Sequence, residues 1–258
     1  MPSTEKMNVR PVLKHVKLCD GDAGKPALLC LPGAMCSPEV FAAMAESTGY
    51  IGYGVPWLES EGPFDLVSLA QRVSELIDQL GKVILVGHSV GTVIAVLAAR
   101  QCMADGRNSV AGLVLSNSGA NTRGLGDIDS LIDKVSMQWG TAFWEAFSTR
   151  CIGTDIPPQL MERLQAYPAQ LNPSAVAESL ASLKAIDLLP VLPSLAGIPA
   201  AVVHGRFDKA RTMAHATELA GALPASSLHV LETGHTSAAE APAAFAGIVQ
   251  SVADRILI

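Results

Sequence analysis

The chain has 258 residues, of which 49% are hydrophobic and 16% charged, so it can supply a large buried core. Its net charge of −6 and the absence of a run of like charge argue against nucleic acid or an anionic membrane surface as its partner. Five scattered cysteines without a C-x-x-C pair predict neither a disulfide framework nor a zinc site. The first twenty residues lack the apolar core of a signal peptide, and the longest apolar stretch, around Val93–Ala99, is far shorter than a membrane span. We therefore expect a cytoplasmic protein with no metal and no cofactor.

Five short apolar runs predict β-strands. They lack the period-two alternation of half-exposed strands, and therefore fit strands that are buried on both faces. In chain order they are Ala27–Leu31, Val83–Gly87, Gly112–Ser116, Ala200–Gly205 and Ser227–Glu232.

Helical patterns lie between and after these runs. In the first, apolar residues recur at three- and four-residue spacing, which is typical of a helix with one buried face. Strands that alternate with helices imply parallel pairing through right-handed crossovers, so we predict an α/β fold with a mostly parallel sheet flanked by helices. The helical segments are Leu66–Leu80, Val90–Met103, Thr212–Leu223 and Pro242–Ile256.

One stretch, Asn121–Leu195, interrupts this alternation. It contains no convincing strand, only helix-like pieces punctuated by glycine and proline. Because it lies between two predicted strands, we expect a helical cap at residues 121–195, inserted into a core made of residues 1–120 and 196–258. A small second domain is the alternative.

Residues Val83–Gly91 read VILVGHSVG, so an apolar strand runs directly into G-x-S-x-G and then into a helix of small and apolar residues. In this context the motif predicts a nucleophile elbow, a sharp turn that exposes the hydroxyl of Ser89 while the glycines keep side chains away from it. The helix N-terminus that follows favours a developing negative charge. We predict that Ser89 is a catalytic nucleophile; an ordinary turn serine is the alternative.

A serine hydroxyl needs an adjacent base to act as a nucleophile near neutral pH. His235 follows the last predicted strand, and parallel sheets bind their ligands at the carboxyl ends of the strands. His88 belongs to the motif itself, but we expect its side chain to point away from that of Ser89. The other histidines fall in strands, in a helix or in the polar N-terminal stretch, and they are His15, His204, His215 and His229. His235 is therefore the predicted base.

The base in turn needs an acceptor on its second ring nitrogen. Asp208, in HGRFDKAR, comes just after the strand that ends at Gly205, and the resulting chain order of serine, aspartate and histidine is the expected one. A rival carboxylate is Asp127, in the loop after Ser116, but it lies much farther from the end of its strand.

Asn117 and Asn121 in that same loop could also hydrogen-bond a histidine, although neither carries the charge that stabilises an imidazolium. Acyl transfer further requires donors for an oxyanion. We expect one to be the backbone N–H of Val90, next to the nucleophile. The other is expected in the loop PGAMCS after Leu31, at the N–H of Ala34, with Met35 as the alternative.

With these residues in place, the sequence resembles the α/β-hydrolase superfamily, in its branch of small capped bacterial serine hydrolases of the esterase and lactonase type. The resemblance extends over nearly the whole chain, through the oxyanion loop, the elbow, HGRFD and ETGHTSAAEAP. Two features depart from it. Pro32-Gly33 stands where many relatives have His-Gly, and GVPWLESEGPFD replaces a glycine-rich turn.

The predicted function is hydrolysis of a small carboxylic ester, lactone or thioester through an acyl-enzyme on Ser89, with a small molecule as the partner and the oligomeric state left open. Two alternatives retain the fold: a C–C bond hydrolase of a vinylogous diketone acid, and a cofactor-free oxygenase or lyase. Relatives of the first kind tend to have tryptophan after the histidine, where this chain has Thr236. Ser89 also disfavours epoxide hydrolases and dehalogenases, whose elbow carries an aspartate. A non-catalytic ligand-binding relative is a further alternative.

Within the cap, aromatic residues are candidates for the substrate pocket, although at helical spacing such residues more often form core. The candidate pocket residues are Met35, Trp139, Phe143 and Trp144, with Met137 and Phe147. Arg123, Arg150 and Arg163 are candidates to meet a substrate carboxylate, and exposed helix faces are the alternative.

Overall fold

The computed structural model describes residues 13–153 and 155–256, and these form a seven-stranded sheet in the order β1-β3-β2-β4-β5-β6-β7. β1 (Val16–Cys19) is antiparallel to its neighbour, and the remaining strands are parallel to one another. This confirms the predicted α/β fold. The parallel strands are β2 (Ala27–Leu31), β3 (Gly52–Gly54), β4 (Val83–His88), β5 (Val110–Ser116), β6 (Ala200–Gly205) and β7 (Ser226–Leu231).

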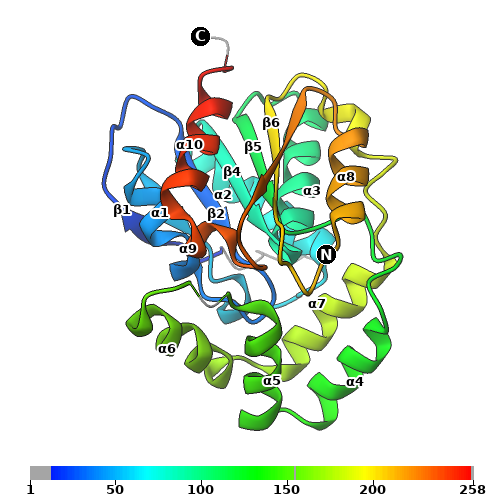
Figure 1. The fold of residues 1–258 in the computed structure, drawn as a ribbon. Helices are drawn as coiled ribbons and strands as arrows, with labels where there is room; N and C mark the ends of the chain where they lie inside the picture. Colours follow the sequence, from blue (N-terminus) through cyan, green and yellow to red (C-terminus); the bar gives the residue numbers. More distant parts are fainter. Residues whose placement is uncertain (1–12, 154, 257–258) are drawn as a thin grey trace, which may run out of the picture.

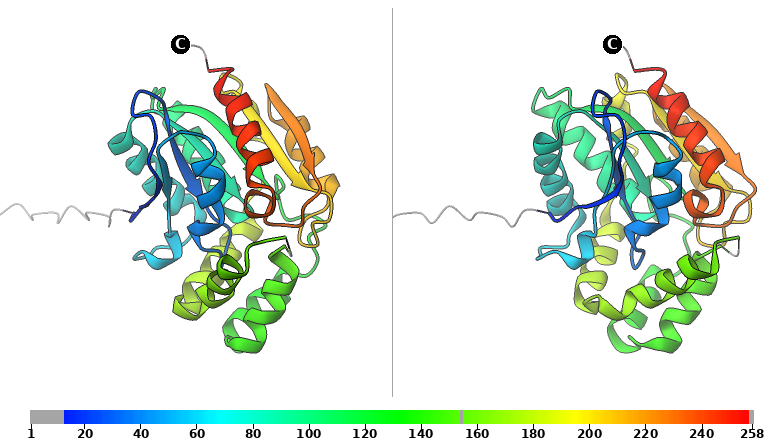
Figure 2. Two further views of the ribbon diagram at one scale, coloured as in Figure 1. Left: turned by 60° about the vertical axis from the view of Figure 1, so that its left-hand side comes forward. Right: turned by 90° about the vertical axis from the view of Figure 1, so that its left-hand side faces the viewer.

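Helices cover both faces of this sheet (Figures 1 and 2). On β4, Val83 and Leu85 pack on one side while Ile84 and Val86 pack on the other, so a strand that reads as uniformly apolar serves two cores. The first core includes α2 (Leu66–Leu80), α3 (Val90–Ala104) and α8 (Met213–Ala222). The second includes α1 (Ala42–Glu46), α9 (Ser237–Glu240) and α10 (Pro242–Ala253).

Helix α2 has the predicted bounds, and local signals explain them. The carboxylate of Asp65 accepts a hydrogen bond from the N–H of Ser68 at 2.9 Å and caps the first turn. At the other end Gly81 adopts φ 81°, a conformation that glycine reaches without strain.

The two outer parts of the sheet differ from the sequence-based prediction. The sequence did not predict β1 or β3. The prediction that the last strand is buried on both faces is wrong, because β7 is the edge strand and is paired only with β6. Leu228 and Val230 on β7 are consequently 38% and 37% exposed.

Between β5 and β6 the described residues form helices and no strand. These helices lie beyond one end of the sheet, as Figures 1 and 2 show, and α7 packs against both α4 and α2. We call this part the α4–α7 segment. It contains α4 (Ile128–Met137), α5 (Thr141–Cys151), α6 (Pro158–Ala166) and α7 (Pro173–Ala185), with 3₁₀ turns at Tyr167–Gln170 and Leu192–Leu195.

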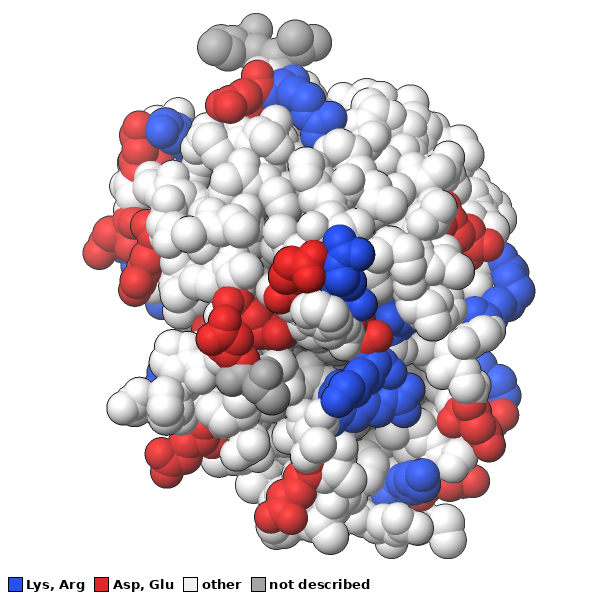
Figure 3. All heavy atoms as spheres, in the orientation of Figure 1, with Lys and Arg blue, Asp and Glu red and all other residues white. Residues whose placement is uncertain are grey.

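Acidic and basic side chains are scattered in small groups among uncharged surface on the face drawn in Figure 3. Among the residues described, no helix combines the length and the apolar character that crossing a membrane requires. Most of the N-terminal stretch that we judged to lack a signal peptide, residues 1–12, lies outside the described part of the chain.

Candidate active site

Ser89 occupies the single position between the end of β4 and the start of α3. Its φ of 53° and ψ of −117° lie in a region that L-residues rarely adopt. The two motif glycines are required by close packing. A Cβ at Gly91 would lie 2.0 Å from the carbonyl oxygen of Leu31, and one at Gly87 would lie 2.6 Å from the Cα of Thr92. The G-x-S-x-G spacing thus allows β2 and α3 to approach the turn that presents Ser89.

His235 lies in the loop after β7 and is 5% exposed. Its Nδ1 is 2.8 Å from Oδ2 of Asp208, which lies in the loop after β6 and has a fully buried side chain. The other carboxylate oxygen, Oδ1, accepts hydrogen bonds from the N–H groups of Ala210 at 2.7 Å and Arg211 at 2.8 Å. Asn117 adds a third donor, from Nδ2 to Oδ2 at 3.1 Å.

These donors decide the charge of Asp208. Burial by itself would raise the pKa of Asp208, but the electrostatic attraction to His235 and the hydrogen bond with it, with the donors from Arg211 and Asn117, outweigh burial and hold that pKa below its ordinary range. The carboxylate is therefore ionised and fixes Nδ1 of His235 as the protonated nitrogen. Nε2 remains the ring nitrogen available to the cavity.

Ser89 and His235 line one cavity of about 190 Å³, between the carboxyl ends of the strands and the α4–α7 segment. The same cavity is lined by Ala34, Met35 and Val90. The structure therefore brings together the candidate nucleophile, the candidate base and the candidate oxyanion donors. Asp208 is not part of the lining and lies behind His235.

The loop after β2 lies directly against the elbow. A Cβ at Gly33 would be 3.1 Å from the Cβ of Ser89, so the loop backbone can run close to the nucleophile. The N–H of Ala34 forms no hydrogen bond among the described residues, and that of Val90 opens α3, where N–H groups lack intrahelical partners. The indole of Trp57 donates a hydrogen bond from Nε1 to the carbonyl oxygen of Pro32 at 3.0 Å and so stabilises this loop.

His88 is a site residue that sequence reasoning misjudged. We expected its side chain to point away from Ser89, but it lines the same cavity, with its ring 4.8 Å from that of His235. The positive φ at Ser89 ends the alternation of a regular strand and accounts for the difference. Burial first, and the neighbouring His235 second, lower the pKa of His88 to about 3, so this ring is neutral at physiological pH.

The rival partners for the histidine serve other groups. Asp127 lines the cavity, but its Oδ1 accepts from the N–H of Ser130 at 2.9 Å and caps α4. Asn117 binds Asp208, as described above, and Asn121 donates to Glu218 Oε2 at 3.2 Å. Among the described residues, Asp208 is the carboxylate that is hydrogen-bonded to His235.

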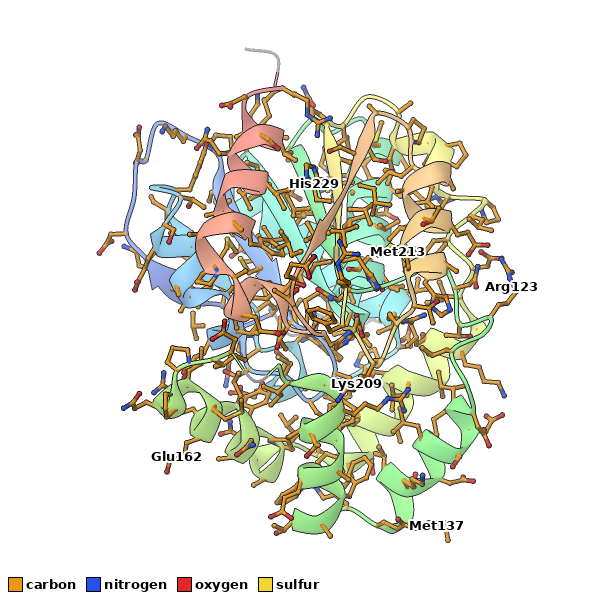
Figure 4. All side chains as sticks on the ribbon, viewed as in Figure 1. Arg123, Met137, Glu162, Lys209, Met213 and His229 are labelled. Carbon is orange, nitrogen blue, oxygen red and sulfur yellow. The ribbon has the colours of Figure 1, made fainter. Side chains whose placement is uncertain are left out.

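Of the candidate pocket residues, Met35 lines the cavity, whereas Trp139, Phe143 and Trp144 do not. Those three pack on one another, with ring centroids 5.9 Å apart for Trp139–Phe143 and 5.7 Å for Trp139–Trp144. The C-terminal half of α5 faces the cavity, so Phe147 contributes to the lining and the aromatic residues before it do not. Met137 is 80% exposed, at the far end of α4 from the sheet (Figure 4).

The candidate arginines also separate. Arg123 lies at the edge of the molecule and pairs with Asp187 at 2.8 Å (Figure 4). Arg163 pairs with Glu39 on the surface. Arg150 lines the cavity, as does Arg211, which sequence reasoning missed.

The model of the alpha/beta hydrolase family matches residues 28–248 of this chain. No curated protein sequence matches the chain at a significant level.

Solved structures resemble it over most of their length. An enol-lactonase from Burkholderia xenovorans LB400 has a TM-score of 0.81 and 20% identity, covering 94% of this chain and 96% of that one. An esterase from Exiguobacterium antarcticum has a TM-score of 0.79 and 20% identity, covering 94% of each chain. A hydrolase from Pseudomonas aeruginosa PA01 has a TM-score of 0.76 and 24% identity, covering 92% of each. At these identities the likeness concerns the fold.

Proposed function

This chain belongs to the alpha/beta hydrolase family, and on that premise we propose that it is a serine hydrolase of small carboxylic esters, lactones or thioesters. The observation that carries the proposal is the 2.8 Å contact between His235 Nδ1 and the ionised Asp208. The loop that contains His235 also brings this residue into one cavity with Ser89. The likeness in fold to an enol-lactonase and an esterase is consistent with this reaction class.

In the first half of the reaction, Ser89 Oγ attacks the carbonyl carbon of the substrate while His235 Nε2 takes the hydroxyl proton. The carbonyl π electrons move to oxygen, and the oxyanion accepts hydrogen bonds from the N–H groups of Val90 and Ala34. The bond to the leaving oxygen or sulfur then breaks as His235 returns its proton to that atom. Asp208 stabilises the imidazolium in between.

In the second half, water attacks the acyl group held on Ser89 and gives its proton to His235 Nε2. The bond from Ser89 Oγ to the acyl carbon breaks, and Oγ recovers the proton. The carboxylic acid product leaves, and every group of the protein regains its starting state. With a lactone, the leaving oxygen stays attached to the product.

We further propose that residues 121–195 act as a cap that moves to admit substrate. Helix α5 supports this role, because Phe147 and Cys151 on its C-terminal half line the cavity opposite the elbow. The cavity volume of about 190 Å³ is small beside the roughly 300–1,000 Å³ of pockets for drug-sized ligands, which favours small substrates.

A turnover screen over esters, lactones, thioesters and vinylogous diketone acids tests the function, with Ser89→Ala as the paired variant. The variant should stay folded by circular dichroism and lose about a millionfold in kcat, as other enzymes do when the triad serine is removed. A fluorophosphonate should label Ser89 in the wild type and fail to label His235→Ala. Cleavage of the diketone acids alone would support the C–C hydrolase instead. Absence of turnover and of labelling would leave a ligand-binding role.

A further inference from the structure

Arg211 places a buried positive charge in the wall of the cavity. The residue is 4% exposed and lines the same cavity as Ser89 and His235. Its backbone N–H is bonded to Asp208, but among the described residues no carboxylate forms an ion pair with its guanidinium. Figure 4 shows the neighbouring Lys209 between the sheet and the α4–α7 segment, so this loop lies where the two parts of the molecule meet.

The guanidinium has unused hydrogen-bonding capacity. It carries five N–H donors, and one bond is formed, from Nη1 to the carbonyl oxygen of Asn121 at 2.9 Å. Nε and Nη2 have no acceptor among the described residues. Neither atom is fully buried, so both remain accessible. These donors are therefore open to a molecule in the cavity.

Arg211 keeps its charge at neutral pH. Burial lowers the pKa of Arg211 to about 10, and the negative charge of Asp208 opposes that effect. A buried charge without an ion-pair partner is costly, and one hydrogen bond to a neutral carbonyl does not require a guanidinium. Besides the two histidines, the cavity lining holds one other cationic side chain, Arg150, and one carboxylate, Asp127, whose Oδ1 caps α4.

From this geometry we infer that Arg211 binds a free carboxylate of the substrate, so that the substrate class is an ester, lactone or thioester bearing a second, unesterified carboxylate. A planar guanidinium with two adjacent free donors matches the two oxygens of a carboxylate. The inference rests on the proposed function for the identity of the scissile bond, but the carboxylate subsite can be measured without catalysis.

Matched substrates test it first. The monomethyl and dimethyl esters of glutaric, adipic and pimelic acids differ in one free carboxylate, and hydrolysis is followed in a pH-stat. The wild type should have the higher kcat/KM on at least one monomethyl ester. Arg211→Met should lower the ratio of kcat/KM for the monomethyl over the dimethyl ester by about 10- to 100-fold, mostly through KM, as expected for loss of a hydrogen-bonded charge pair.

Arg206→Met is the matched control, since Arg206 is on the same loop but pairs with Glu232 on the surface. It should leave the ratio unchanged. Arg211→Lys keeps the charge and should retain part of the preference. A wild type that prefers the dimethyl esters, or a ratio unchanged in a folded Arg211→Met, overturns the inference.

A binding measurement separates the subsite from the reaction. Ser89→Ala is titrated calorimetrically with glutarate, adipate and pimelate, and Ser89→Ala/Arg211→Met is titrated in parallel after its fold has been checked by circular dichroism. Binding of a dicarboxylate that weakens at least tenfold without the guanidinium supports the subsite even if no ester is ever turned over. Failure of all three to bind Ser89→Ala overturns it. If the double variant does not fold, the same comparison is made with Ser89→Ala/Arg211→Lys, which must weaken binding.

Discussion

Glu240 is bonded twice to Thr236, the residue that follows the candidate base. Its Oε1 accepts from the backbone N–H of Thr236 at 3.0 Å and from Oγ1 at 2.9 Å, while Oε2 accepts from the N–H of Gly234 at 2.7 Å. One carboxylate therefore binds the N–H groups of the two residues that flank His235. Thr236 Oγ1 also accepts from the N–H of Gly153, so the same residue connects the histidine loop to the α4–α7 segment.

Glu240→Gln should lower kcat by about tenfold while changing KM little. The substituted amide has one acceptor in place of two, so one of the loop N–H groups loses its bond and His235 is held less firmly. Loss of hydrogen bonds to a charged group should also lower the free energy of unfolding by about 1.5–3 kcal/mol. Steady-state kinetics and urea unfolding measure both. Glu232→Gln, which removes an exposed ion pair with Arg206, should do neither.

Two aspartates near the site should respond differently to the same change. Asp208→Asn should cut kcat by about 10⁴-fold, because the histidine loses the charge that fixes its tautomer and stabilises its protonated form. Asp127→Asn should stay within about tenfold, because an asparagine also caps a helix. Kinetics on the best ester of the screen distinguish them. The reverse ranking would assign the acid to the loop after β5.

The central strands and α2 could be predicted because their signals are local. An apolar run bounded by turn residues identifies β4, and Asp65 and Gly81 bound α2 within the sequence itself. β1 and β3 have no such signal. VKLC and GYG are short, and they are strands because Val16 pairs with Gly54 and Leu28 pairs with Gly52 across the sheet.

The same distinction holds for the candidate site. Ser89, Asp208 and His235 could be predicted to lie near one another because each follows a strand end in a sheet whose carboxyl ends converge. Arg211 could not be predicted in the same way, because HGRFDKAR is an ordinary polar loop by sequence. Only the folded structure shows its contact with the carbonyl oxygen of Asn121. The place of the aromatic residues depends on which half of α5 lies over the strands, and helical periodicity does not carry that information.

The free energy of unfolding should decrease as the pH falls below about 6.5. An unfolded histidine gains a proton there, whereas His88 in the folded state stays neutral down to a pKa of about 3. The unfolded state therefore binds more protons between about pH 3 and 6.5, so this contribution to stability is lost as the pH falls, by up to about 1.4 kcal/mol per pH unit. Burial lowers the pKa of His204 as well and adds to the slope. His88→Gln should flatten the fall in Tm; parallel curves for variant and wild type would contradict it.

Gly247 in α10 and Gly112 in the strand beneath it should respond oppositely to substitution by alanine. Gly247 is in the interior of α10, exposed, with nothing within 4 Å of a Cβ, so Gly247→Ala should raise the free energy of unfolding by about 0.5–1 kcal/mol through helix propensity. Gly112 on β5 faces the buried side of the same helix, where a Cβ would be 2.7 Å from Cγ1 of Val252. Gly112→Ala should push α10 from the sheet and lower the free energy of unfolding by about 1–3 kcal/mol, as overpacked cores do.

Urea unfolding of the two variants and of Gly112→Ala/Val252→Ala measures these changes. The second alanine should offset part of the Gly112→Ala loss, because it removes the methyl group that the new Cβ meets. Additive losses in the double variant would instead mean that the strand, rather than the helix contact, cannot accept a side chain at this position.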